Sequence, residues 1–260
     1  MLIYLKTLLK KTCPNFLLIF VQSLRLPLKP KLNKKLLESI FNNKEGIEIG
    51  GPSDNFRYVL PIYEYIETLD VLNFSNETIW EGQINEGEKI ELYKNKYAAQ
   101  IIGETTNLDK INSDSYDFVI SNNCLEHSAN PLKGLEEWKR MTRNNGHILL
   151  VLPKKESNFD WKRPFTPFEV ILEKYNNDIG EDDLSSLEEI LKYHDLSKDP
   201  LAGNFSDFKE RSLNNFKNRG LHHHVFNLSS MDEMFNFFGI DVLFKSENKI
   251  DYFIIGKVNK

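Results

Sequence analysis

Cysteine is scarce in this 260-residue chain, which contains only Cys13 and Cys124, far apart in the sequence. Two distant cysteines exclude a disulfide framework and a cysteine-based zinc site, and they suit a reducing compartment. An excess of positive charge is also lacking, because the formal net charge is −5. The whole molecule is therefore not built to hold nucleic acid electrostatically, and we expect a cytoplasmic protein without a nucleic-acid partner.

Long hydrophobic runs are absent as well, and the apolar stretch 16–21 is far too short to span a bilayer. It lies in a basic segment, residues 1–35, which has eight lysines and arginines and no acidic residue. The segment lacks the small-residue cleavage site of a signal peptide. Such a segment either packs on the domain as helix with its lysines in water, or touches the inner face of a membrane as a peripheral amphipathic helix.

The chain is organised around the stretch 46–53, a short apolar strand that carries Glu48 and runs into Gly50 and Gly51. Glycine lets the main chain turn tightly and lets a ligand approach the backbone N–H groups. A strand that ends in such a loop is where open α/β sheets bind nucleotides. An ordinary strand followed by a Gly-Pro turn also fits these residues, so the choice depends on motifs farther along the chain.

Apolar stretches alternate with helical patterns and predict a mainly parallel sheet with helices on both faces. Pro61 should shorten or break the first crossover helix. The last two strands are joined too closely for a parallel crossover, so they should form an antiparallel hairpin. The expected elements are strands at 68–72, 98–102, 116–121, 147–152, 240–244 and 252–258, a helix at 132–141, and a helix that Ser229 or Ser230 caps and Gly239 ends.

Five short motifs lie in a fixed order along these elements: 49–53 (Ile-Gly-Gly-Pro-Ser), 104–108, 115–119, 125–127 (Leu-Glu-His) and 146–153. This succession resembles the class I S-adenosylmethionine-dependent methyltransferases, over about residues 44–153 and again over 221–260. It is most similar to the branch with an Ile-Gly-Gly-Pro-Ser first loop. The loop departs from the usual pattern, because Pro52 and Ser53 stand where a third glycine is expected.

The resemblance implies an α/β Rossmann-like sheet, mostly parallel, with a C-terminal antiparallel hairpin, a helical insertion and a helical N-terminal segment. The expected domains are the basic segment 1–35, a methyltransferase core of 36–154 and 221–260, and an inserted region, 155–220. Because loops at the carboxyl ends of strands normally carry substrate recognition, we expect the insertion to be a lid that binds the acceptor.

The resemblance also implies S-adenosylmethionine as cofactor and assigns residues to it. Glu48, Gly50 and Gly51 form the first loop, whose glycines would face the methionine part. Asp70, 20 residues beyond Gly50, would bind the ribose hydroxyls. The acidic slot for the adenine amino group falls on Glu104, with the Thr105 N–H beside it, and Asn122 would offer its carbonyl to the ammonium group.

Trp80 lies on the long connection between the second and third strands, where it either stacks on adenine, closes the site or packs in the interior. In the insertion, Asp160 and Arg163 are candidates to bind a polar or anionic acceptor. Surface ion pairs that hold a helical decoration are the alternative for both residues.

Three consecutive histidines, 222–224, follow the insertion. In an extended chain His222 and His224 point to one side, where either suits a general base near neutral pH, and we assign His223 to acceptor binding. His127 is a second candidate base. A divalent metal on His194, Asp195, His222 and His224 is the alternative, but their spacing is not that of dedicated sites, so we expect no metal.

The sequence therefore predicts a methyltransferase that acts on a small polar acceptor, by O-methylation of a sugar or sugar nucleotide in surface-glycan assembly. N-methylation of another small metabolite is the alternative. A dinucleotide-dependent oxidoreductase would share the glycine loop, but Pro52 and Pro61 oppose its unbroken Gly-x-Gly-x-x-Gly helix. A non-catalytic binding protein of the same fold is the second rival. The sequence predicts no oligomeric state.

Overall fold

The computed structural model describes residue 30 and residues 32–260. The expected helical N-terminal segment and its membrane contact fall largely outside these residues. The first described element is helix α3 (Lys34–Phe41), which begins where the Asn33 side chain accepts a hydrogen bond from the Lys35 N–H. Nowhere in the described part of the chain is a helix both long and apolar enough to cross a membrane.

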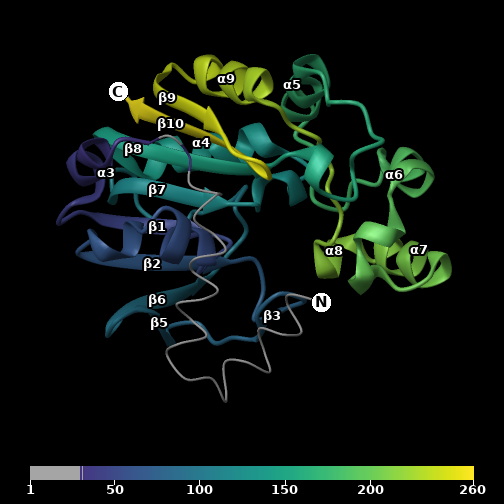
Figure 1. The fold of residues 1–260 in the computed structure, drawn as a ribbon, viewed down its shortest axis with the longest axis horizontal. Coiled ribbons are helices and arrows are strands. Elements are labelled where there is room, and N and C mark those ends of the chain that lie inside the picture. Colours follow the sequence, from purple (N-terminus) through teal and green to yellow (C-terminus); the bar gives the residue numbers. More distant parts are fainter. Residues whose placement is uncertain (1–29, 31) are drawn as a thin grey trace.

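An eight-stranded sheet forms the centre of the structure, in the order β5-β6-β2-β1-β7-β8-β10-β9 (Figure 1). Its central strands are parallel: β6 (Lys96–Ile102), β2 (Thr68–Asn73), β1 (Glu45–Ile49), β7 (Tyr116–Asn122) and β8 (Thr142–Pro153). Strand β10 (Asp251–Val258) is antiparallel to β8 and to β9 (Ile240–Glu247). The Rossmann-like fold and the C-terminal hairpin are thus confirmed.

One face of the sheet is covered by α4 (Pro131–Met141), α5 (Phe168–Asn176) and α9 (Leu228–Phe237). Trp138, Ile171 and Met234 are fully buried there. The expected start of the last helix is corrected: Asn227 is its cap, and Ser230 returns a bond to the Asn227 N–H in a capping box.

The other face is covered by α3 and by two short turns, η2 (Asn55–Val59) and η3 (Ile62–Glu64). Phe56 and Ile62 bury their side chains completely from these turns. Pro61 lies between them, where its fixed ring prevents a continuous helix, as predicted. The first crossover therefore packs on the sheet without an α-helix.

Two small hairpins on the connection between β2 and β6 were not predicted. Strand β5 (Lys89–Tyr93) pairs antiparallel with β6 at the sheet edge, and β3 (Glu77–Thr78) pairs with β4 (Gly82–Gln83). Their short, largely exposed strands bury little apolar surface, so the hydrophobic pattern that marks central strands is missing.

The segment between β8 and α9 contains η5 (Lys155–Ser157), α5, α6 (Leu187–Tyr193), η6 (Leu196–Lys198), η7 (Pro200–Ala202), α7 (Phe205–Leu213) and α8 (Asn215–Asn218). Helices α6, α7 and α8 lie beyond the carboxyl ends of the parallel strands (Figure 1). A separate small core holds them together through Ile190, Ala202, Phe208 and Leu221. This segment therefore lies next to the loops that follow the parallel strands.

Candidate active site

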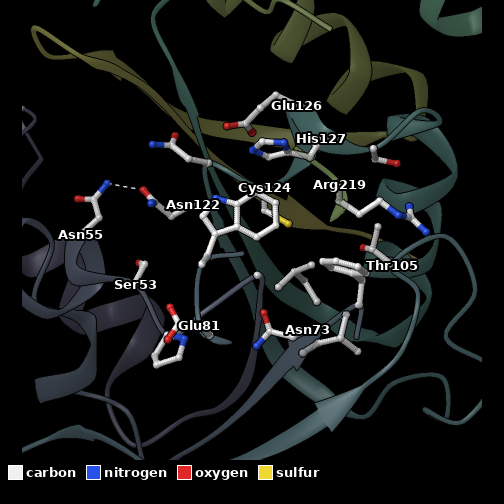
Figure 2. A pocket seen from close by; sticks show the side chains of 18 of the residues that line it. Ser53, Asn55, Asn73, Glu81, Thr105, Asn122, Cys124, Glu126, His127 and Arg219 are labelled. Carbon is white, nitrogen blue, oxygen red and sulfur yellow. Dashed lines mark hydrogen bonds between the residues drawn. The ribbon is translucent and has the colours of Figure 1, made fainter. Parts of the chain in front are cut away.

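A pocket of about 700 Å³ opens at the carboxyl ends of the parallel strands (Figure 2). Its volume is in the range of small-molecule sites. The lining comes from the first loop, from the ends of β2, β6 and β7, and from the segment that precedes α9. It includes Gly50, Ser53, Asn73, Glu104, Thr105, Asn122, Glu126, His127, Arg219 and His222.

The first loop reaches the pocket through Gly50, whose φ is +79°. A Cβ atom there would lie 2.6 Å from the Cys124 sulfur, so only glycine fits. The prediction for Glu48 is wrong: this buried carboxylate does not line the pocket but accepts hydrogen bonds from the Ser53 N–H (2.9 Å) and the Tyr63 hydroxyl (2.5 Å). Burial raises the pKa of Glu48 to about 7. Glu48 therefore supports the loop from behind.

The expected ribose ligand, Asp70, is not at the pocket. It lies in the middle of β2, and its carboxylate accepts a hydrogen bond from the Tyr116 hydroxyl (2.7 Å). The last residue of β2, Asn73, lines the pocket instead and donates its amide to the Gly51 carbonyl (2.9 Å). Gly51, the second glycine of the first loop, is buried and does not line the pocket, contrary to prediction. At the pocket, Asn73 therefore lies in the position that was expected for Asp70.

Glu104 and Thr105 follow β6 and line the pocket together, as predicted. One Glu104 oxygen accepts the Thr105 N–H (3.0 Å), and the other pairs with Arg219 (2.7 Å). Arg219 also pairs with Glu181 (2.7 Å), so it holds two carboxylates across the pocket wall. Burial raises the pKa of Glu104, although Arg219 opposes the shift.

Asn122 ends β7 and lines the pocket beside the first loop, where its side-chain oxygen accepts a hydrogen bond from the Asn55 amide (2.5 Å). Trp80, on the connection between β3 and β4, is 41% exposed and also lines the pocket. Its indole packs edge-on against the His127 ring at 5.0 Å. Of the alternatives for Trp80, interior packing is therefore excluded.

A carboxylate and two imidazoles meet in the pocket wall: Glu126, His127 and His222. The first two come from the turn η4 (Leu125–His127) just after β7. The Glu126 carbonyl accepts the His223 N–H (2.8 Å), which ties this turn to the histidine run. Figure 2 shows Glu126 and His127 at the opposite end of the pocket from Asn73. The pocket thus has two chemically different ends.

His222 is oriented by Asp160, whose carboxylate oxygen lies 2.5 Å from Nδ1. Arg163 in turn holds Asp160 (2.9 Å) and donates to the His222 carbonyl (2.8 Å). Burial would lower the pKa of His222, but the charge and hydrogen bond of Asp160, together with the charge of Glu126, outweigh it and the pKa is raised. Asp160 and Arg163, predicted to bind the acceptor, are 2% and 1% exposed and do not line this pocket; they support His222 from behind.

The other two histidines of the run point away from the large pocket. His223 contacts the Asn215 amide (2.9 Å), and His224 lies 3.1 Å from the Ala129 carbonyl. Burial lowers the pKa of each to about 3, so both are neutral, structural side chains. The predicted acceptor contact of His223 and the catalytic role of His224 are corrected accordingly.

The pocket residues that were missed from the sequence include Asn73, Glu126 and Arg219. Asn73 could have been found from the end of its apolar strand, since side chains there point to the nucleotide crevice. Glu126 stood beside His127 in the Leu-Glu-His motif. Arg219 carried no signal, because only the folded segment brings it to Glu104.

Comparison with known proteins gives one family match: residues 71–150 match the family model described as a methyltransferase domain. No curated protein matches the chain. Among solved structures, a SAM-dependent methyltransferase from Aquifex aeolicus is similar at 12% identity and a TM-score of 0.47, over 90% of this chain and 92% of that one. A SAM-dependent methyltransferase from Methanosarcina mazei is similar at 10% identity and 0.48, over 88% and 98%.

Proposed function

We propose that this chain, by its domain and fold an S-adenosylmethionine-dependent methyltransferase, methylates a hydroxyl group of a small polar acceptor, a sugar or sugar nucleotide of surface-glycan assembly. The observation that carries the proposal is the pocket that joins Gly50, Asn73 and Glu104 at one end to His127 and His222 at the other. The first end provides acceptors of hydrogen bonds, and the second also contains Glu126, which can take up a proton because burial raises its pKa to about 7.

The first end fits the donor by the chemistry of its side chains. Adenine, ribose and the methionine ammonium group all present hydrogen-bond donors, and Glu104, Asn73 and Asn122 present oxygens that accept. We assign Glu104 to the adenine amino group, Asn73 to the ribose hydroxyls and Asn122 to the ammonium group. Gly50 leaves the space that a side chain would fill, so the methionine part can approach the first loop.

The second end fits a hydroxyl-bearing acceptor. Glu126, His127 and His222 offer a carboxylate and two imidazoles, and Asn123 and Asn158 add two amides to the same lining. The exposed indole of Trp80 offers an apolar surface beside them. A few convergent polar groups next to an aromatic ring are typical of sites that orient a polar small molecule.

When bound, S-adenosylmethionine supplies an electrophilic methyl carbon, so the acceptor oxygen forms the new C–O bond while the C–S bond breaks and sulfur keeps its electrons. The chain must then position the acceptor and let its hydroxyl proton leave. The cluster of Glu126, His127 and His222 lies where that proton departs. Asp160 fixes the ring of His222, so that Nε2 faces Glu126 at 4.0 Å.

Purified protein with methyl-labelled S-adenosylmethionine, screened against a panel of sugar nucleotides and a matched panel of small amines, tests the proposal. We expect label in sugar nucleotides, in a methyl ether that resists the mild alkaline treatment that releases methyl esters. Label in amines alone would replace O-methylation by N-methylation. No transfer to either panel, together with no binding of S-adenosylhomocysteine, would contradict the function as a whole.

A further inference from the structure

We propose that Glu126, His127 and His222 bind a divalent transition-metal ion at the acceptor end of the pocket. One ligand atom from each residue lies within 4.8 Å of the other two. Two imidazoles and one carboxylate are a ligand set that holds divalent zinc, manganese or iron and leaves positions open for substrate. The role we give the ion rests on the proposed function, but the site itself does not.

The ring of His222 is held as in known metal sites. Its Nδ1 faces the Asp160 carboxylate at 2.5 Å, and a carboxylate can only accept, so Nδ1 carries the hydrogen. In the neutral ring the other nitrogen, Nε2, then has the lone pair, and it lies 4.0 Å from Oε1 of Glu126. A carboxylate behind a metal-binding histidine fixes its tautomer and raises its basicity.

His127 has the same arrangement with a different partner. Its Nδ1 lies 3.0 Å from the Leu221 carbonyl, which also can only accept. The lone pair of the neutral ring is therefore on Nε2. Both histidines thus donate one ring N–H to the protein and keep the other nitrogen for a ligand.

Glu126 supplies an independent observation. The residue is 1% exposed, and its Oε2 atom is buried with no hydrogen-bond partner among the described residues. A buried carboxylate oxygen without a partner is costly, because it has lost its hydration without compensation. A divalent cation between this carboxylate and the two imidazoles would provide the missing interaction.

The ligand set differs from the one considered from the sequence. His194 contacts the Asp199 carboxylate (3.2 Å), Asp195 accepts from the Trp161 indole (2.6 Å), and His224 faces a backbone carbonyl. Those residues do not converge with His222. An ion on the new set would face the pocket, where it could hold an acceptor oxygen and favour loss of its proton.

Titration calorimetry of Zn²⁺ and of Mn²⁺ into the chelator-treated full chain, without donor or acceptor, tests the site. We expect one ion per chain, and at least a 100-fold loss of affinity in Glu126→Gln, His127→Gln and His222→Gln. Asp160→Asn should lose 10- to 100-fold, as is usual for the partner behind a metal-binding histidine. His147→Gln, at a half-buried histidine in the middle of β8, is the matched control and should bind like the parent.

Circular dichroism checks that each variant is folded. If one of the three ligand variants does not fold, the other two still test the site. Equal affinity in the parent and in folded Glu126→Gln, or no binding by the parent, would overturn the metal site. Methyl transfer by a chain that binds no ion would leave the proposed function intact. Ion binding without methyl transfer to either acceptor panel would remove the function and leave the site.

Discussion

Nδ1 of His222 lies 2.5 Å from a carboxylate oxygen of Asp160, although 62 residues separate them in the chain. Arg163 binds the same carboxylate and is itself 1% exposed. The segment between β8 and α9 therefore sets, from behind, the orientation of a side chain in the pocket wall.

Asp160 is accordingly a positioning residue. We expect Asp160→Asn to lower kcat 10- to 100-fold, because the amide no longer holds the imidazole in one tautomer. The KM for S-adenosylmethionine should stay near that of the parent, since Asp160 does not line the large pocket. Steady-state kinetics check this, with Asp178→Asn, an exposed carboxylate of the same segment, as control. A 10- to 100-fold rise of KM without a change in kcat would contradict this positioning role.

Asn73 and Asp70 make a matched pair on strand β2. Asn73→Ala should weaken binding of S-adenosylhomocysteine about tenfold, because one hydrogen-bonding group at the pocket is removed. Asp70→Ala should leave the affinity within about twofold, because its carboxylate binds Tyr116 away from the pocket. Titration calorimetry of S-adenosylhomocysteine into the two variants shows which of the two residues binds the donor. The opposite order of affinities would restore Asp70 as the ribose ligand.

Arg219 joins Glu104 to Glu181 and is 8% exposed. Arg219→Met should lower the free energy of unfolding by about 3 kcal/mol, since it leaves two carboxylates side by side without their cation. Arg143 also pairs with two carboxylates, but in solvent, so Arg143→Met should cost under about 1 kcal/mol. Urea denaturation measures both. Similar losses in the two variants would mean that burial of Arg219 is unimportant.

Glu48 predicts a dependence of stability on pH. Its pKa is raised to about 7 in the folded chain, so the folded state holds its proton more tightly than the unfolded state. The associated stability is complete below about pH 4.5 and is lost as pH rises to about 7. For a fully buried group this amounts to about 3 kcal/mol.

Glu48→Gln should remove this contribution, so the fall in the free energy of unfolding between pH 5 and pH 8 becomes smaller than in the parent. Urea denaturation at the two pH values measures the difference. Glu45→Gln, exposed at the start of the same strand, is the control. If Glu48→Gln and the parent lose the same free energy of unfolding between pH 5 and pH 8, Glu48 is not the group that titrates in this range.

Much of the fold could be predicted because apolar periodicity and turn residues are local signals. The parallel strands, the antiparallel hairpin at the C-terminus and the break at Pro61 can all be read from short, continuous stretches of the sequence. The hairpin of β5 with β6 escaped prediction, since an exposed edge strand has little hydrophobic pattern. The cap of α9 was misplaced by two or three residues, within the usual uncertainty of helix ends.

The candidate site was predicted less completely, for two physical reasons. A spacing of 20 residues from Gly50 selected Asp70, but side chains three positions apart on a strand point to opposite faces, and the strand ends at Asn73. Contacts such as His222 with Asp160 depend on a whole folded segment and have no local signature. The sequence could therefore place Glu104 and Asn122 at the pocket but not the support behind His222.

The central claim is that one pocket holds the methyl donor at its Asn73–Glu104 end and the acceptor at its Glu126–His222 end. A crystal structure with S-adenosylhomocysteine tests it most directly. We predict adenine beside Glu104, the ribose hydroxyls on Asn73, and the sulfur directed toward His127 and His222. An adenosyl group bound outside this pocket, or one with its sulfur turned away from the histidines, would contradict the account.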